Sequence, residues 1–302
     1  MSRSKTVNYF CYLIVCACLI CASALTTQIN KIETISLCEL NEIKDLFCEF
    51  FVNDVFSYSL FGDKPLSIYR RVLSADPIEK DMTPTQLDNY CLNIFEPCCK
   101  PFSILRKQWQ VWCHNKKNFV FKNYLILQNL FCGKLYILFI NKKAFLNVVN
   151  ENLALFQKII DPQLSADNLL FALNEEKDNL FDLIHSNQIL FGILLGFGKH
   201  NPTLFQQREN LINALGKNLQ KSDLLKKKIE ILNRKLQPFH PHDSCLLSSI
   251  NRVCFSADPT NYETIELRKK YDELNLKINK IYSQEDWFEQ IILKLTTDYT
   301  DN

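Results

Sequence analysis

The sequence predicts an α+β protein that is predominantly α-helical, with a small antiparallel β-hairpin sheet in the middle and a C-terminal helical hairpin. Three observations support this fold class. The chain of 302 residues contains only 6 Gly and 10 Pro, so few residues interrupt its helices. Apolar residues recur at helical spacing over most of the chain. Two adjacent stretches between residues 119 and 140 are instead rich in aromatic and aliphatic residues on either side of Gly133, as the strands of a hairpin are.

The first half of the chain supplies both strands of this hairpin and the elements before it. Its periodicity and turn residues predict a helix, a turn, a strand, a second helix and the two hairpin strands. In chain order these are Leu37–Phe56, Gly62–Pro65, Leu66–Leu73, Phe102–Cys113, Phe119–Leu127 and Lys134–Ile140.

The last third of the chain carries two seam patterns, in which apolar residues alternate between spacings of four and three. They are Leu225, Ile229, Leu232 and Leu236, then Leu267, Tyr271, Leu274, Ile278 and Ile281. This period is typical of packed helices, so we expect the two helices to form a helical hairpin joined by residues 238–259. Everything after Ser165 reads as helix, and Thr260 with Glu263 fits a capping box.

The N-terminus has the order of a secretory signal peptide. Arg3 and Lys5 precede an apolar run from Tyr9 to Leu25, which ends on Ala22-Ser23-Ala24. We expect cleavage after Ala24, so residues 1–24 engage the membrane during export and the protein is periplasmic or secreted. An uncleaved anchor at residues 9–25 is the alternative, because that run is just long enough to span a bilayer. A lipoprotein acylated at Cys18 is a further option.

The remaining region, 25–302, is helix-rich α+β. One option divides it into a mixed α/β part, 25–162, and an all-helical part, 163–302, although no linker marks the boundary. The formal net charge of +2 comes from Arg3 and Lys5, so the mature chain is neutral, which argues against a nucleic-acid partner. Four of the 13 cysteines lie in the signal, which leaves an odd number.

Charge is unevenly distributed along this neutral chain. Residues 217–235 contain seven basic residues and two acids, whereas residues 151–182 contain seven acids and two lysines. The two segments could face each other, or each could be a solvated helix face. The basic triplet Lys226-Lys227-Lys228 could also contact anionic lipid.

Half of the glycines gather in one short segment. Gly192, Gly196 and Gly198 precede Lys199, His200 and Asn201. A phosphate-binding loop is excluded, because Gly192 is one residue too far away and His200 replaces the required hydroxyl. The pattern favours a buried helix whose glycines allow close backbone approach, with Gly198 near its C-terminal end. A partner- or ligand-facing role is the sharper hypothesis, and it covers this segment and the earlier turn: Gly62, Asp63, Lys64, Gly192, Gly196, Gly198, Lys199, His200 and Asn201.

A polar loop near residue 240 offers the remaining candidate chemistry. His240 and His242 are weak metal-ligand candidates, because their spacing matches no zinc signature and loop polarity alone explains them. Cys245 and Cys254 flank this loop and form the best candidate disulfide, with free thiols as the alternative. The sequence contains no catalytic motif and predicts no cofactor.

Three segments carry a resemblance to known sequences. They are Phe56–Pro65, Leu190–Asn201, and Phe255–Pro259 with Glu263-Thr264 and Lys269-Lys270-Tyr271. In these segments the chain resembles an uncharacterised family of exported proteins from intracellular bacteria. The resemblance implies export but assigns no activity and no catalytic residue.

The sequence therefore favours a non-enzymatic interaction or envelope-associated protein, whose partner is another protein or an envelope component. This hypothesis depends on the export signal, the seam helices and the lack of a catalytic signature. The first alternative is a hydrolase-type enzyme that uses His200 or the His240/His242 loop. A secreted factor that acts on a host cell is the second alternative.

Overall fold

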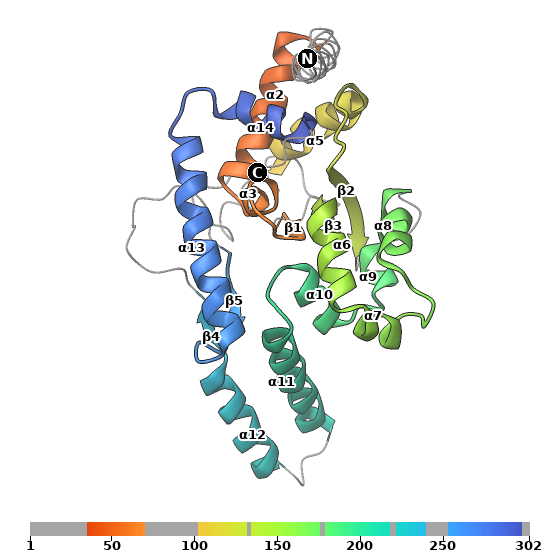
Figure 1. Cartoon of the computed structure of the whole chain (residues 1–302), viewed down its shortest axis with the longest axis vertical. Helices are drawn as coiled ribbons and strands as arrows, with labels where there is room; N and C mark the ends of the chain where they lie inside the picture. Colours follow the sequence, from red (N-terminus) through yellow and green to blue (C-terminus); the bar gives the residue numbers. More distant parts are fainter. Residues whose placement is uncertain are drawn as a thin grey trace, which may run out of the picture.

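A computed structural model describes residues 35–69, 102–131, 134–175, 179–217, 222–239 and 253–297 (Figure 1). Residues 1–34 lie outside the described residues, so the predicted signal peptide and the alternative anchor stay predictions. His240, His242 and Cys245 also lie outside them. Among the described helices, none combines the length and apolarity needed to cross a bilayer.

The described elements confirm a predominantly helical α+β fold. In chain order they are α2 (Leu37–Phe47), the π-helix η1 (Cys48–Val52), α3 (Phe56–Leu60), β1 (Leu66–Ile68), α5 (Phe102–Asn115), the 3-10 helix η3 (Lys116–Asn118), β2 (Tyr124–Phe131), β3 (Lys134–Asn141), α6 (Lys142–Glu151), α7 (Leu153–Ile159), α8 (Ala166–Asn174), α9 (Leu180–Leu183), α10 (Gln188–Leu194), α11 (His200–Lys217), α12 (Ser222–Lys235), β4 (Gln237–Phe239), β5 (Phe255–Ala257), α13 (Tyr262–Tyr282) and α14 (Trp287–Thr296).

The predicted antiparallel hairpin is confirmed as β2 and β3, and β1 joins the opposite edge of β3 to give the order β1-β3-β2. Successive strand residues point to opposite faces of a sheet. Ile137 and Phe139 accordingly belong to one core, and Leu138 and Ile140 belong to another. The first strand of the hairpin, β2, begins later than the predicted Phe119. Phe119 instead follows the 3-10 turn η3 and packs its ring 5.2 Å from Trp112.

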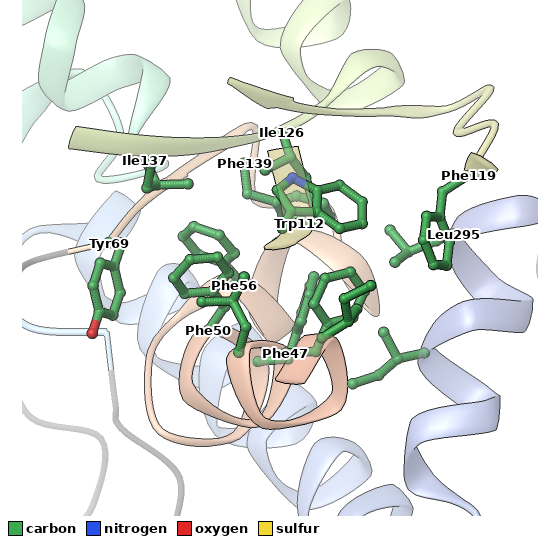
Figure 2. Packing of buried hydrophobic residues seen from close by; sticks show 14 of the residues in the cluster. Phe47, Phe50, Phe56, Tyr69, Trp112, Phe119, Ile126, Ile137, Phe139 and Leu295 are labelled. Atoms are coloured by element: carbon green, nitrogen blue, oxygen red, sulfur yellow. The ribbon is translucent and has the colours of Figure 1, made fainter. Parts of the chain in front are cut away.

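One face of this sheet is covered by a core of aromatic rings (Figure 2). Phe47 lies 5.2 Å from Trp112, and Phe56 stacks on Phe139 at 5.3 Å between ring centroids. The expected continuous helix from Leu37 to Phe56 is wrong beyond Phe47, where the chain forms the π-helix η1 and then restarts as α3. The π-helix carries Phe50 and Phe51, and both side chains are fully buried.

The opposite face of the sheet packs against α6 and α8 to α10 through aliphatic side chains. A third, smaller core joins α3 and α13 to a second sheet of β4 and β5, through residues that include Tyr58, Phe239 and Tyr271. The expectation of helix throughout after Ser165 is wrong at this second sheet. Its strands lie on the two sides of residues 240–252, so their pairing joins residues that are distant in sequence.

The C-terminal helical hairpin is confirmed, and its two helices are α11 and α12. Helix α12 thus packs along α11, and not along the helix that follows it as the seam pattern led us to expect. The seam residues Tyr271 and Ile278 of α13 contribute to the third core, next to α3. In Figure 1 the hairpin extends away from the central sheet.

Candidate functional site

The glycine-rich segment forms the turn between α10 and α11. The amide of Phe197 donates to the carbonyl of Gly192 at 3.0 Å, and the amide of Gly196 donates to that of Ile193 at 2.9 Å. These two bonds make a Schellman motif, which ends α10 earlier than the glycine pattern predicts. Gly196 and Gly198 have φ values of +75° and +74°, a backbone region that favours glycine.

Gly192 confirms the expected close backbone approach. A Cβ atom at this position would lie 2.4 Å from Cγ of Pro202, so the Pro202 ring of α11 packs directly against the backbone of α10. The glycine therefore fixes how closely the base of the hairpin approaches α10.

The three segments that carry the resemblance converge along the first half of α13, and we call this region the junction. Gly196 lies against Lys64 and Pro65, and the hydroxyl of Tyr271 donates to the Gly196 carbonyl at 2.8 Å. Phe197 stacks on Phe255 with 4.2 Å between ring centroids. Burial raises the pKa of Tyr271, so its hydroxyl stays protonated as a donor.

Glu263 caps the first turn of α11 from the neighbouring helix. Its carboxylate accepts hydrogen bonds from the amides of Lys199 at 2.9 Å and His200 at 2.8 Å. A carboxylate is favourable at this end of a helix, where amides lack partners and the helix dipole is positive. Gly198 leaves room for it, because a Cβ there would lie 2.4 Å from Cδ of Glu263.

The N-terminus of α13 differs from the sequence prediction. Asn261 is the capping residue, and its side chain accepts from the amide of Glu263 at 3.0 Å. The predicted capping box of Thr260 and Glu263 is therefore wrong, because Thr260 donates to Asp258 and Glu263 turns to α11.

Asn201 is the polar centre of the junction, and it is 1% exposed. Its Oδ1 atom accepts from the amide of Asp258 at 3.0 Å and from Oγ1 of Thr264 at 3.1 Å. Its Nδ2 atom donates to the carbonyl of Phe197 at 3.1 Å. One buried amide thus connects α11, the segment before α13, and the turn after α10.

His200 has the carboxylate partner that a hydrolase would require, but the order of the groups differs from a nucleophilic triad. Its Nε2 atom lies 3.4 Å from Oδ2 of Asp258. The other Asp258 oxygen accepts from the hydroxyl of Thr260 at 2.7 Å, and this bond, helped by His200, lowers the pKa of Asp258. A nucleophile must contact the histidine that activates it. Here the Asp258 carboxylate lies between His200 and the hydroxyl of Thr260, so these contacts stabilise a loop.

The predicted turn Gly62-Asp63-Lys64 is divided between the junction and the surface. Lys64 is buried, and its Nζ atom donates to the carbonyl of Leu66 and to Oγ of Ser67. Asp63 is exposed and forms an ion pair of 2.7 Å with Lys270 on α13.

The metal and disulfide candidates stay predictions. Within the described residues, no group of three or more His, Cys, Asp or Glu side chains is placed to hold a metal ion, and both His240 and His242 lie outside that part of the chain. Cys254 is exposed, and its predicted partner Cys245 is not among the described residues.

The structure also reveals a lysine-lined cavity that sequence reasoning missed. It has a volume of ≈ 580 Å³, and four lysines line it: Lys143, Lys270, Lys277 and Lys294. These lysines come from α6, α13 and α14, and only Lys270 belongs to a segment that the sequence had singled out. Gly62 and Asp63 lie at the same cavity, which is the one part of the predicted site that borders it.

Comparison of the chain with protein families, curated proteins and solved structures gives no match. The resemblance to exported proteins of intracellular bacteria therefore stays a prediction.

Proposed function

We propose that this protein is a non-enzymatic, exported interaction protein whose helical hairpin binds an acidic amphipathic helix of a partner protein. One observation carries the proposal. Among the described side chains of α11 and α12, only Asn201 and Pro202, at the base of the hairpin, are buried. Two helices alone leave most of their apolar surface in water, and a third helix would cover it.

The exposed face of α12 has the pattern of a helix-binding surface. Leu224 and Ile231 are seven residues apart, so they lie on one side of the helix, and they are 60% and 49% exposed. Lys228 and Lys235 follow them on the same side. The seam residues Leu225, Ile229 and Leu232 are half-buried, so the more exposed second face is left for a partner.

Charge supports an acidic partner. The basic segment 217–235 includes α12, and α12 packs on α11. Figure 1 shows the tip of the hairpin pointing away from α7, α8 and α9, the helices of the acidic segment. Complementary charge speeds association and selects partners, and a partner helix of opposite sign would fit this surface.

The junction gives the hairpin a fixed direction. Glu263 caps α11, Asn201 ties its first turn to the segment before α13, and Gly192 sets its distance from α10. A projecting element that is held rigidly loses less entropy on binding than a mobile one. The residues singled out by the sequence then act as supports for the binding surface, without touching the partner.

The test is affinity capture from soluble and envelope fractions of the producing cells, using the wild type and the double variant Leu224→Glu/Ile231→Glu. Both side chains are exposed, so the double variant should keep its circular dichroism spectrum. We expect the partner to be captured by the wild type and lost with the double variant. Raised salt should weaken the capture, because part of the attraction is between exposed charges.

The matched control is Phe171→Glu, which changes a side chain on α8 that is 64% exposed and far from the hairpin in sequence. It should capture the partner as the wild type does. Equal capture by all three proteins would refute the proposal. Binding of the hairpin to anionic lipid vesicles, in place of a protein, would refute the helical partner.

A further inference from the structure

Helix α8 presents an exposed face on which a phenylalanine lies beside a carboxylate. Among the phenylalanines whose side chains the structure describes, Phe171 alone is exposed, at 64%. Asp167 lies about one turn earlier on the same side of the helix and is exposed as well. The other side of α8 is fixed in the core through Leu169 and Leu173, so the fold itself places Phe171 at the surface.

The chain around Phe171 is acidic. Helices α7 and α8 lie within residues 151–182, which contain seven acids and two lysines. Of these acids, Glu151, Asp161, Asp167 and Asp182 are exposed. Protein interfaces are commonly built from an aromatic anchor with polar and charged residues around it. The exposed face of α8 therefore has the composition of an acidic docking surface.

The exposed face of α12 is the complement of this surface. Leu224 and Ile231 are its exposed apolar residues, and they lie about two helical turns apart. Lys227, Lys228 and Lys235 are exposed on the same side of the helix. An aromatic ring packs well between two aliphatic side chains, and ammonium groups beside them attract carboxylates. The faces of α8 and α12 therefore match in apolar content and are opposite in charge.

The structure keeps these two faces of one molecule apart. Helix α8 packs against α6 beside the central sheet, whereas α12 belongs to the hairpin that extends away from the sheet (Figure 1). Contact between the acidic face of α8 and the basic face of α12 therefore requires two copies of the chain.

We infer that the exposed face of α12 binds α8 of a second copy of this chain, with Phe171 of that copy between Leu224 and Ile231. This inference rests on the binding surface of the proposed function and adds a second occupant, which competes there with the partner protein. The contact joins two different surfaces, so each copy keeps one of them for a further copy. One short helix on one helix face makes a small interface, so the assembly dissociates on dilution and leaves the hairpin of the monomer uncovered.

Sedimentation velocity of the purified protein at increasing concentration measures this self-association. A reductant is included, because Cys38 and Cys254 are exposed and a disulfide between copies would imitate the contact. The sedimentation coefficient of the wild type should rise with concentration, and raised salt should oppose the rise. Leu224→Glu/Ile231→Glu and Phe171→Glu should each self-associate at least about tenfold more weakly, because each places a charge in the apolar contact. A wild type that stays monomeric at every concentration would overturn the inference.

A mixture of these two variants tests which surfaces meet. Phe171→Glu keeps an intact face on α12, and Leu224→Glu/Ile231→Glu keeps an intact face on α8. An equimolar mixture should therefore form a one-to-one dimer that grows no further. The matched control Leu276→Glu changes a residue of α13 that is 73% exposed, and it should assemble like the wild type. A mixture that stays monomeric, or assembly of every variant like the wild type, would overturn the inference.

Charge reversal tests the complementarity without changing the apolar residues. Lys228→Glu/Lys235→Glu should weaken self-association severalfold, because the face of α12 then repels the acidic face of α8. Adding Asp167→Lys to the same chain should recover part of the loss. Unchanged self-association of the lysine variant would show that charge does not select the second copy, and would contradict the inference.

The proposed function and this inference can fail separately. Phe171→Glu keeps its own hairpin face, so it should still capture the partner protein while it loses self-association. Capture of another protein by a wild type that is monomeric when purified would refute only the self-association. Self-association without any captured partner would refute only the partner protein.

Discussion

At the scale of single residues, Asn201 shows how a buried polar side chain specifies one arrangement of the chain. Its amide satisfies two donors and one acceptor that come from three different segments. A buried group that loses its partner costs more free energy than an ordinary hydrogen bond contributes. The junction therefore tolerates little change at this position.

We predict that Asn201→Ala lowers the free energy of unfolding by about 2–3 kcal/mol, because it leaves the Asp258 amide and the Phe197 carbonyl without this partner. Urea unfolding followed by circular dichroism measures the change. The control is Asn210→Ala, an exposed asparagine of the same helix, which should change stability by less than about 0.5 kcal/mol. Equal effects of the two substitutions would contradict the role assigned to Asn201.

The sequence indicated the importance of this residue only indirectly. Glycines are scarce in the chain, so the cluster ending at Gly198 stood out and drew attention to Asn201 beside it. Its partners Asp258 and Thr264 are about sixty residues away in sequence, and no local pattern connects them. Asn261 was missed as a cap for a different reason, because Thr260 one residue earlier fits the same motif with Glu263 three residues later.

At the scale of elements, the two ends of the α10–α11 region place glycine in opposite environments. Gly192 packs against Pro202, whereas a Cβ atom on Gly216, near the end of α11, would meet no atom within 4 Å. The same substitution should thus have opposite effects at the two positions.

We predict that Gly192→Ala destabilises the protein by about 1–3 kcal/mol through overpacking. Gly216→Ala should stabilise it by up to about 1 kcal/mol, since alanine favours helix more than glycine does. Thermal unfolding of the two variants beside the wild type measures both shifts. A stabilising Gly192→Ala substitution would show that α10 and α11 do not pack as closely as described.

Element types were more predictable than their partners. The β2–β3 hairpin could be predicted because its strands are adjacent and share one short connection. The partner of α12 could not be predicted. Its seam spacing matches that of α13, but periodicity does not indicate which helix lies opposite. The break after Phe47 was hidden for a similar reason, since Phe50 and Phe51 continue an apolar helical pattern that the π-helix interrupts.

At the scale of the whole molecule, burial is concentrated around the central sheet and is low in the hairpin. Residues Ile137–Ile140 of β3 are fully buried, whereas no described side chain of α12 is. Segments with few buried contacts open more easily than the core does.

We predict that backbone amides of α12 exchange with deuterium much faster than those of β3. Amides of β3 should exchange only through global unfolding, while those of α12 open locally. Mass spectrometry of peptic fragments measures deuterium exchange in α12 and in β3 separately. Slow exchange throughout α12 would show that the hairpin is already covered in the isolated protein, contrary to the proposed binding surface.

The arrangement of the central sheet has a consequence for the order of folding. β2 and β3 are neighbours in sequence, but β1 pairs Leu66 with Ile140, across the whole of α5 and the hairpin. Closing a long loop costs chain entropy before the contact gives any return, so sequence-distant pairings form slowly. We therefore expect the β2–β3 hairpin to form first and to serve as the template on which β1 is added. The turn Gly62–Pro65 directly precedes β1, so the junction and the wall of the lysine-lined cavity would be completed together, as a late event in folding.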